Sequence, residues 1–281
     1  MNDLLISVRA LGRADYSKQC LDSLLANSDL DCDFFLFQDG AVNPISGERY
    51  AKDKEVKDNV NVFIKSKLPN KTVMAATNNI GGANAKVAIL NYAFPKYKYL
   101  MMLDNDLIFN KYYIKTVKTL FKQFDESKYV GMIQTSYRHF PDTPIETKKF
   151  AKENENKVAQ GFSHRWEQGF FRSKWDKIGA LLKDFAIINK RNDTMLLVKN
   201  DPRVKSDHDK LCATYGKPTD DYILETCTKR AGLTGIHTLT LRHIPIGEKG
   251  QYTMNENRWR NEKFSKIKMF DVGNVNSYKL E

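Results

Sequence analysis

The sequence lacks the features of a membrane-spanning or disulfide-stabilised protein. No stretch approaches the ~20 consecutive apolar residues that a transmembrane helix needs. Met1–Ser7 has neither a basic segment nor a long apolar one, so we expect no signal peptide. None of the four cysteines, at positions 20, 32, 212 and 227, belongs to a C-x-x-C pair. We therefore expect no zinc ribbon or thioredoxin-type site. We expect reduced thiols in a cytoplasmic protein.

Three common nucleotide or catalytic motifs are also absent. The sequence has no G-x-x-x-x-G-K-[ST], no G-x-G-x-x-G and no G-x-S-x-G. These absences argue against a P-loop enzyme, a Rossmann oxidoreductase and a hydrolase with a nucleophile elbow. With 281 residues, 41% of them hydrophobic and 28% charged, the chain is nevertheless long and apolar enough to bury a core.

Positive charge is in excess. The 45 Lys and Arg residues outnumber the 34 Asp and Glu residues, which gives a formal net charge of +11. Such a charge favours polyanionic partners such as nucleic acid, anionic lipid or phosphorylated substrates. The alternative is a lysine-rich composition without functional meaning, because net charge bears on partners and not on fold.

The apolar pattern alternates between strand-like and helix-like segments, as in an α/β fold with a mostly parallel sheet flanked by helices. The expected strands are Leu4–Val8, Phe34–Phe37, Val60–Ile64, Tyr99–Leu103, Met132–Ser136 and His237–Ile244. The expected helices are Ser17–Leu25, Asn84–Phe94, Trp175–Leu182 and Asp221–Ala231. Residues 141–156 are expected to form an exposed loop or surface helix.

Two carboxylates follow the most apolar of these strands. Asp104 and Asp106 come directly after Tyr99–Leu103, at the strand end where α/β proteins bind ligands. Residues two apart in an extended segment point the same way, and two adjacent carboxylates repel unless a cation lies between them. Their oxygen atoms suit Mg²⁺ or Mn²⁺. The alternative is an Asp-rich turn that caps the next helix.

Several segments together resemble the GT-A fold glycosyltransferases, of the broad family-2-like type that uses nucleotide sugars. They are the opening strand, Cys20–Leu24, Asp39, Asn79–Lys86, Leu103–Asp106, Gly169–Gly179 and Asp220–Leu224. The resemblance covers about residues 3–247 and implies a single Rossmann-like domain with an acceptor-side extension. Residues 1–130 would bind the nucleotide sugar, 131–248 would bind the acceptor, and 249–281 would form a polar tail or lid.

The resemblance implies roles for the donor-binding residues. Asp39 would bind the base or ribose, or is simply a turn residue before Gly40. Arg9 would line the nucleotide pocket, although it matches the family pattern poorly. Lys86 would lie near the diphosphate, the alternative being a solvated helix face. Asn79, with the glycines that follow it, would shape a loop close to the donor, or form an ordinary strand-to-helix turn.

The metal and acceptor sites are likewise implied by the resemblance. Asp104 and Asp106 would hold Mn²⁺ or Mg²⁺, with Asp104 also near the donor ribose. His243 would be a third metal ligand or a structural histidine, with His237 and His164 as rivals.

Asp221 would be the general base of an inverting reaction, and Asp220 would cap the helix or help to bind the acceptor. A retaining enzyme would need no such base. Trp166 and Glu167 would line the acceptor pocket, although Trp166 is as well suited to the core.

The sequence thus predicts a metal-dependent glycosyltransferase (hexosyl- or pentosyltransferase) that acts on a nucleotide-sugar donor. The acceptor would be a surface glycan or lipid-linked saccharide, or hydroxymethylated bases of phage DNA. The protein would be cytoplasmic, in a bacterial cell or a phage-infected host, with peripheral contact to anionic membranes left open.

Two other classes remain as alternatives. A nucleotidyltransferase usually has a Gly-rich basic loop after the first strand, whereas Arg9–Arg13 contains one glycine. A non-catalytic nucleic-acid-binding protein is favoured only by the charge and weakly by Arg258–Arg260.

Overall fold

The computed structural model describes residues 2–45, 47–137, 147–163, 166–191, 220–248, 267–270, 272–273 and 275–281, with 206, 209, 210 and 213 as isolated positions. Within these ranges the side chains of 184–191 and 220–223 are left aside.

A mixed sheet crosses the molecule in the strand order β11-β7-β9-β6-β8-β4-β1-β2-β3. The strands of this sheet are β1 (Leu4–Ala10), β2 (Asp33–Gln38), β3 (Lys71–Ala75), β4 (Tyr99–Asp104), β6 (Val130–Gln134), β7 (Lys157–Gln160), β8 (Glu167–Phe171), β9 (Thr234–Thr238) and β11 (Lys279–Leu280). The four strands β3-β2-β1-β4 are all parallel. Strand β8 runs antiparallel between β4 and β6, so it joins the two halves of the sheet.

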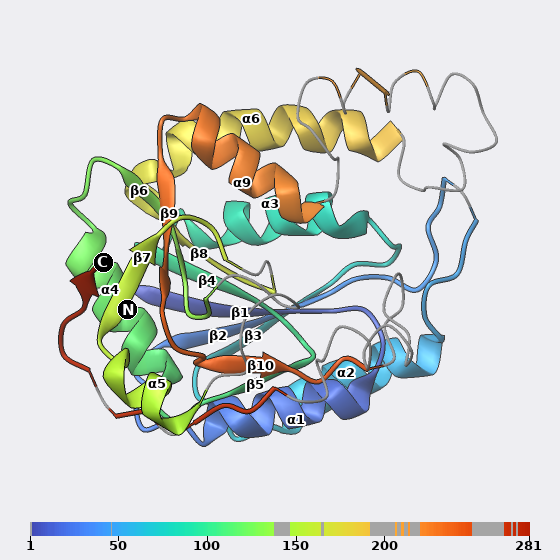
Figure 1. Ribbon diagram of the computed structural model, residues 1–281. Coiled ribbons are helices and arrows are strands. Elements are labelled where there is room, and N and C mark those ends of the chain that lie inside the picture. The colour runs from blue at the N-terminus through green and yellow to red at the C-terminus, as the bar shows by residue number, and fades with distance from the viewer. Residues whose placement is uncertain are drawn as a thin grey trace.

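Helices cover both faces of this sheet (Figure 1). Helices α3 (Gly81–Ala93), α6 (Arg172–Arg191) and α9 (Asp220–Arg230) lie on one face, and α1 (Ala14–Leu25) and α2 (Asp53–Lys65) lie on the other. The remaining described helices are α4 (Tyr113–Phe124) and α5 (Lys148–Glu153). No helix in the described part of the chain is long and apolar enough to span a bilayer.

Alternate residues of β1 enter two separate cores. Leu4, Ile6 and Val8 pack on the α1 side of the sheet, whereas Leu5 packs on the α3 side. Successive side chains of a strand point to opposite faces, so a continuous apolar run is what a strand buried on both faces requires. The predicted α/β class, with a mostly parallel sheet flanked by helices, is confirmed.

The predicted strand Val60–Ile64 is wrong, because these residues belong to α2. The apolar residues at 60, 62 and 64 alternate as in a strand, but Ile64 is exposed while Phe63 is fully buried. Val56, Val60 and Phe63 follow helical spacing, so they share one face of helix α2. The third parallel strand is instead β3, whose alternation is weak because it lies at the sheet edge.

The predicted strand His237–Ile244 is also wrong in its extent. It is divided into β9, which ends at Thr238, and β10 (His243–Pro245). Strand β10 leaves the large sheet and pairs antiparallel with β5 (Leu107–Phe109). The division follows from backbone hydrogen bonds that Leu239 and Arg242 make to Lys157 and Thr135.

The last described residues pack against the domain. Tyr278 is buried, exchanges two hydrogen bonds with Gln123 of α4, and precedes the short strand β11 that pairs with β7. Arg242, fully buried, donates to the carbonyl oxygens of Glu155 and Gly273. The predicted tail is thus held to the domain at its end, while residues 249–266, as well as 141–146, lie outside the described residues.

Candidate active site

The carboxyl ends of β1, β2 and β4 bring the first candidate residues to one edge of the sheet. Arg9 of β1 lies opposite Asp104 of β4 in the parallel register. Asp39 follows β2, and its backbone N–H donates to the carbonyl of Ala10 in β1. Because these strands are parallel, their carboxyl ends meet at the same edge, which is where α/β folds place ligands.

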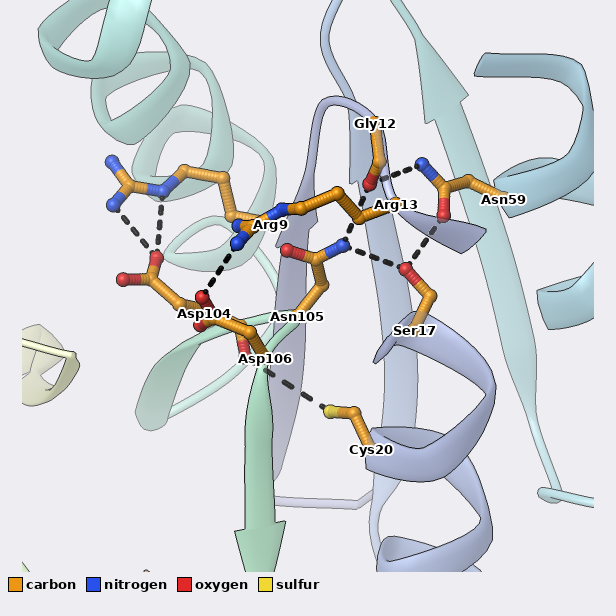
Figure 2. Close-up of polar contacts among 9 residues, drawn as sticks. All are labelled: Arg9, Gly12, Arg13, Ser17, Cys20, Asn59, Asp104, Asn105 and Asp106. Atoms are coloured by element: carbon orange, nitrogen blue, oxygen red, sulfur yellow. Dashed lines mark hydrogen bonds and ion pairs between the residues drawn. The ribbon is translucent and has the colours of Figure 1, made fainter. Parts of the chain in front are cut away.

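Asp104 forms an ion pair with Arg9. The Arg9 Nη2 and Nε atoms donate to Asp104 Oδ1 at 2.8 and 3.2 Å (Figure 2). The two side chains are 20% and 26% exposed, so the pair is open to solvent. Both predicted donor-binding residues therefore lie together, and one carboxylate oxygen accepts both bonds from the guanidinium.

Asp106 forms a second ion pair, with Arg13 at the start of α1. Arg13 Nη1 lies 3.1 Å from Asp106 Oδ2, with 21% and 19% of the two side chains exposed (Figure 2). Burial raises the pKa of the Asp106 carboxyl; Arg13 opposes the rise and the charge of Asp104 adds to it. The two aspartates thus repel each other, as the sequence predicted, and each is compensated by an arginine.

Asn105, between the two aspartates, fixes the turn. Its Nδ2 donates to the Gly12 carbonyl at 3.1 Å and to Ser17 Oγ at 2.7 Å. Ser17 in turn donates to Asn59 of α2, whose amide also reaches the Gly12 carbonyl. Figure 2 shows this network beside the ion pairs. It ties β4 to the β1–α1 turn, so the aspartates and Arg13 are held by the same contacts.

Asp39 organises the loop before α3. Its Oδ1 accepts the backbone N–H groups of Gly40 and Ile80, both at 2.9 Å, and its Oδ2 accepts Asn79 Nδ2 at 3.1 Å. Burial raises the pKa of Asp39, and the backbone N–H groups and the nearby Arg9 oppose the rise. The structure thus joins Asp39 and Asn79 in one turn, near Arg9.

Close backbone packing explains the glycine after Asp39. A Cβ atom on Gly40 would lie 2.2 Å from the backbone carbon of Asn78. Only glycine allows the two turns to approach this closely.

Lys86 and Trp166 lie at different depths. Lys86, in α3, is only 2% exposed, which excludes the alternative of a solvated helix face. Trp166 is half-buried; its carbonyl accepts the N–H of Asp104 at 3.0 Å, and its ring packs beside the core. Trp166 therefore has the core contacts that were one of its two predicted roles, and its backbone lies beside Asp104.

His243 is not assembled with the two aspartates. Strand β10 pairs His243 with Phe109, further along β5 than Asp106. Its Nδ1 lies 3.3 Å from Thr135 Oγ1 and 3.8 Å from Glu167 Oε1, and both the histidine and the glutamate are fully buried. Among the described residues, no three His, Cys, Asp or Glu side chains gather closely enough to hold a metal ion.

Glu167 does not line an open pocket, contrary to the prediction. It accepts hydrogen bonds from Tyr113 Oη at 2.7 Å and from the backbone N–H of Thr135. Burial raises the pKa of Glu167 to about 7, and these hydrogen bonds oppose the rise. The reason is its position at the start of β8, between β4 and β6, where no side chain reaches solvent.

The other candidates are placed only in part. His237 is buried in β9, opposite Gln134 of β6. Asp220 and Asp221 begin α9, as expected for a helix start, but their side chains lie outside the described residues. His164 also lies outside them.

Asp104 and Asp106 are the candidate ligands for a divalent cation, and among the described residues no third His, Cys, Asp or Glu side chain completes a metal-binding group with them. Asp104 and Asp106 supply hard carboxylate oxygens from one turn, the donor set that Mn²⁺ and Mg²⁺ prefer. A positive group already stands against each carboxylate, in the form of the Arg9 and Arg13 guanidinium groups. The negative charges of Asp104 and Asp106 are thus already compensated by arginines of the same chain.

Sequence reasoning missed Arg13 and Gly247. A Cβ atom on Gly247 would lie 2.2 Å from Asp106 Oδ2 and 3.3 Å from Arg13 Nη1, so the chain after β10 closes directly onto this ion pair. Arg13 follows Gly12 just after the first strand, a signal that could have identified it. Nothing in the sequence indicated Gly247, because its neighbour is far away along the chain.

No protein-family model matches this sequence, and no curated protein matches it either. Several solved structures are similar to this chain in fold. One is Staphylococcus aureus TarS residues 1–349, with 11% identity over 68% of this chain and 56% of that one, at a TM-score of 0.45. The same TarS fragment in complex with UDP-GlcNAc matches with 11% identity over 63% of this chain and 47% of that one, at 0.43.

Another is the mannosyltransferase PcManGT from Pyrobaculum calidifontis in complex with GDP-Man and Mn²⁺. It matches with 11% identity over 82% of this chain and 73% of that one, at a TM-score of 0.45. The chain spans about half the length of the TarS fragment. Inferences about catalysis therefore rest on the residues of this chain.

Proposed function

We propose that this protein is a metal-dependent glycosyltransferase that transfers a sugar from a nucleoside-diphosphate sugar to an acceptor hydroxyl. The observation that carries the proposal is the turn at the end of β4. There Asp104 and Asp106 stand side by side at the ligand-binding edge of the sheet, each against an arginine. Asp39 and Asn79 form a second polar turn near Arg9 at the same edge.

In this proposal Asp104 and Asp106 hold Mn²⁺ or Mg²⁺, which when bound neutralises charge on the diphosphate leaving group. Arg9 and Lys86 add positive charge near the donor. The N–H groups after Asp39 hold that carboxylate in place, so that it can bind the ribose or base. Trp166, whose carbonyl binds the Asp104 N–H, would flank the acceptor.

Asp221 is proposed as the general base of an inverting reaction. It would take the proton of the acceptor hydroxyl as that oxygen attacks the anomeric carbon. Asp220, at the first position of α9, would cap the helix and contribute to acceptor binding. NMR of the anomeric centre of the product distinguishes this reaction from a retaining one.

A donor-hydrolysis assay tests the reaction class before any acceptor is known. UDP- and GDP-sugars are incubated with the protein with and without Mn²⁺, and release of the nucleoside diphosphate is measured. We expect metal-stimulated release that Asp106→Ala abolishes. Release that is equal in the wild type and in Asp106→Ala would remove the proposal.

Two classes of acceptor are consistent with the net charge of +11. One is a surface glycan or lipid-linked saccharide at an anionic membrane, and the other is phage DNA with hydroxymethylated bases. For DNA, Lys148 and Lys149 at the start of α5 are exposed candidates for phosphate contacts. Lys190–Arg191 and Arg258–Arg260 are further candidates from the sequence.

Binding of the inactive Asp106→Ala protein to duplex DNA over a salt series separates these acceptors. A DNA acceptor predicts that affinity falls by orders of magnitude between low and moderate salt, because several phosphates are neutralised. No binding at low salt removes DNA and leaves the glycan. Sugar transfer to DNA containing hydroxymethylcytosine would establish the DNA acceptor, since basic proteins also bind DNA loosely.

A further inference from the structure

Each carboxylate of the β4 turn is paired with a guanidinium group of the β1 segment. The pairs are Arg9 with Asp104 and Arg13 with Asp106, at 2.8 and 3.1 Å between their nearest atoms. About a fifth of each side chain is exposed, so the pairs lie where a ligand can reach them. Ion pairs that solvent can reach are weak, and a stronger partner can displace either member.

We propose that Arg13 is a diphosphate-binding residue that Asp106 holds in place until the donor and its cation arrive. When the donor and its cation bind, the Asp106 carboxylate would exchange Arg13 for the cation, and the Arg13 guanidinium would turn to a phosphate oxygen. Before the exchange each aspartate is paired with an arginine; after it, both aspartates would face the cation, and Arg9 and Arg13 would face the diphosphate. The inference rests on the proposed function. It adds Arg13 to the donor-binding residues and states the order in which the charged groups change partners.

The position of Arg13 supports this role. Its carbonyl accepts the N–H groups of Tyr16 and Ser17, so Arg13 directly precedes the first turn of α1. The N–H groups and dipole at the start of a helix favour a phosphate. A guanidinium there adds full positive charge and two parallel donors, a geometry that matches phosphate oxygens.

The surroundings restrict where Arg13 can go. Its guanidinium lies 5.3 Å from the centre of the Tyr16 ring, and Gly247 lies close to both members of the ion pair. Arg13 also has a φ of +63°, a conformation that few residues with a side chain adopt. An arginine at this strained position costs stability, which is expected where a side chain serves a ligand.

The exchange makes two opposite predictions for a neutral residue at position 13. Without nucleotide, Arg13 competes with the cation for Asp106, so its removal should strengthen cation binding. With the cation in place, Arg13 binds phosphate, so its removal should weaken diphosphate binding. A purely structural arginine would weaken both when removed.

The experiment uses the full chain with Arg13→Asn, because asparagine tolerates a positive φ. Arg13→Gly is a second neutral variant for the same reason. Arg49→Gln is the matched control, since Arg49 pairs with Asp53 on the surface and its loss removes the same unit of charge. Thermal melting shows whether each variant remains folded.

Two affinities are measured. Mn²⁺ alone is titrated by electron paramagnetic resonance, and UDP and GDP are titrated by calorimetry at saturating Mn²⁺. For Arg13→Asn we expect Mn²⁺ alone to bind about fivefold more tightly and the nucleoside diphosphate about fivefold or more weakly, the lower range of coupling between ligands. Arg49→Gln should leave both affinities unchanged.

The outcomes separate this inference from the proposed function. If the wild type binds UDP or GDP with Mn²⁺ but Arg13→Asn leaves both affinities unchanged, or lowers both, the exchange is overturned alone. If the wild type binds neither UDP nor GDP at saturating Mn²⁺, the proposed function fails and the exchange fails with it.

Discussion

The acidic side chains near β4 differ in their access to solvent, with Asp104 and Asp106 in one group and Glu167 in the other. Asp104 and Asp106 lie at the sheet edge, partly exposed, each against an arginine. Glu167 lies one strand away and is fully buried, with Tyr113, Thr135 and His243 around it. In our proposal the first group exchanges its partners for a ligand, whereas Glu167 is fully buried and out of reach of solvent. Acidic residues near a site therefore differ in role according to solvent access.

The largest effect is expected from removing the Asp106 carboxylate. Asp106→Ala should lower transfer by roughly a thousandfold, because a cation that neutralises a leaving group contributes several kcal/mol. Its melting temperature should stay close to that of the wild type, since Asp106 is held mainly by Arg13. Steady-state kinetics and calorimetric melting test both statements. An active Asp106→Ala protein would contradict the distinction between the two groups.

Removing the buried Glu167 carboxylate should instead lower the stability of the fold. Glu167→Ala leaves the Tyr113 hydroxyl and the Thr135 N–H without their acceptor and opens a cavity where β8 meets β6. We expect a loss of about 4 kcal/mol in the free energy of unfolding. Urea denaturation measures it, with the surface variant Glu153→Ala as a control that should change little. A loss below about 1 kcal/mol would show that Glu167 is not a structural acid.

The pH dependence of stability tests the same residue. The pKa of Glu167 is about 7 in the folded protein against a usual value of 4.5. The folded state therefore binds the extra proton between these values, and this contribution to stability is full below pH 4.5 and lost as the pH rises through 7.

Glu167→Gln does not titrate, so it supplies the reference. The unfolding free energy of the wild type should fall relative to that of Glu167→Gln by up to about 3 kcal/mol across this window. Denaturation series at several pH values measure the difference. A difference that does not change with pH would show that Glu167 is ionised throughout.

The smallest effect is expected at Gly247. In Gly247→Ala the new Cβ would overlap Asp106 Oδ2, which is the end of a side chain and can move aside. We expect the fold to remain intact while Mn²⁺ affinity falls about tenfold, or about 1.4 kcal/mol. Gly232→Ala is the control. Gly232 has a φ of +73° and open space around it, so this substitution should lower the free energy of unfolding and leave Mn²⁺ affinity unchanged.

The sequence allowed the α/β class, β1, β2, β4 and the Asp104–Asp106 turn to be predicted. Strands buried on both faces are continuous apolar runs, and these strands end abruptly in polar residues. The edge strand β3 and the helix α2 were confused, because an edge strand has little buried surface and a helix with scattered valines can mimic alternation. Sequence patterns report burial, and they fail where burial is slight.

The sequence by itself placed Asp104 and Asp106 two residues apart, directly after a buried strand. Only the tertiary structure decided their partners. Arg13 and Gly247 meet Asp106 because the parallel register brings the β1–α1 turn beside β4, and because the pairing of β10 with β5 returns the chain to the same turn. The same pairing placed His243 against Glu167. Such contacts join residues far apart along the chain, and they depend on which distant strands pair, which no short segment of sequence determines.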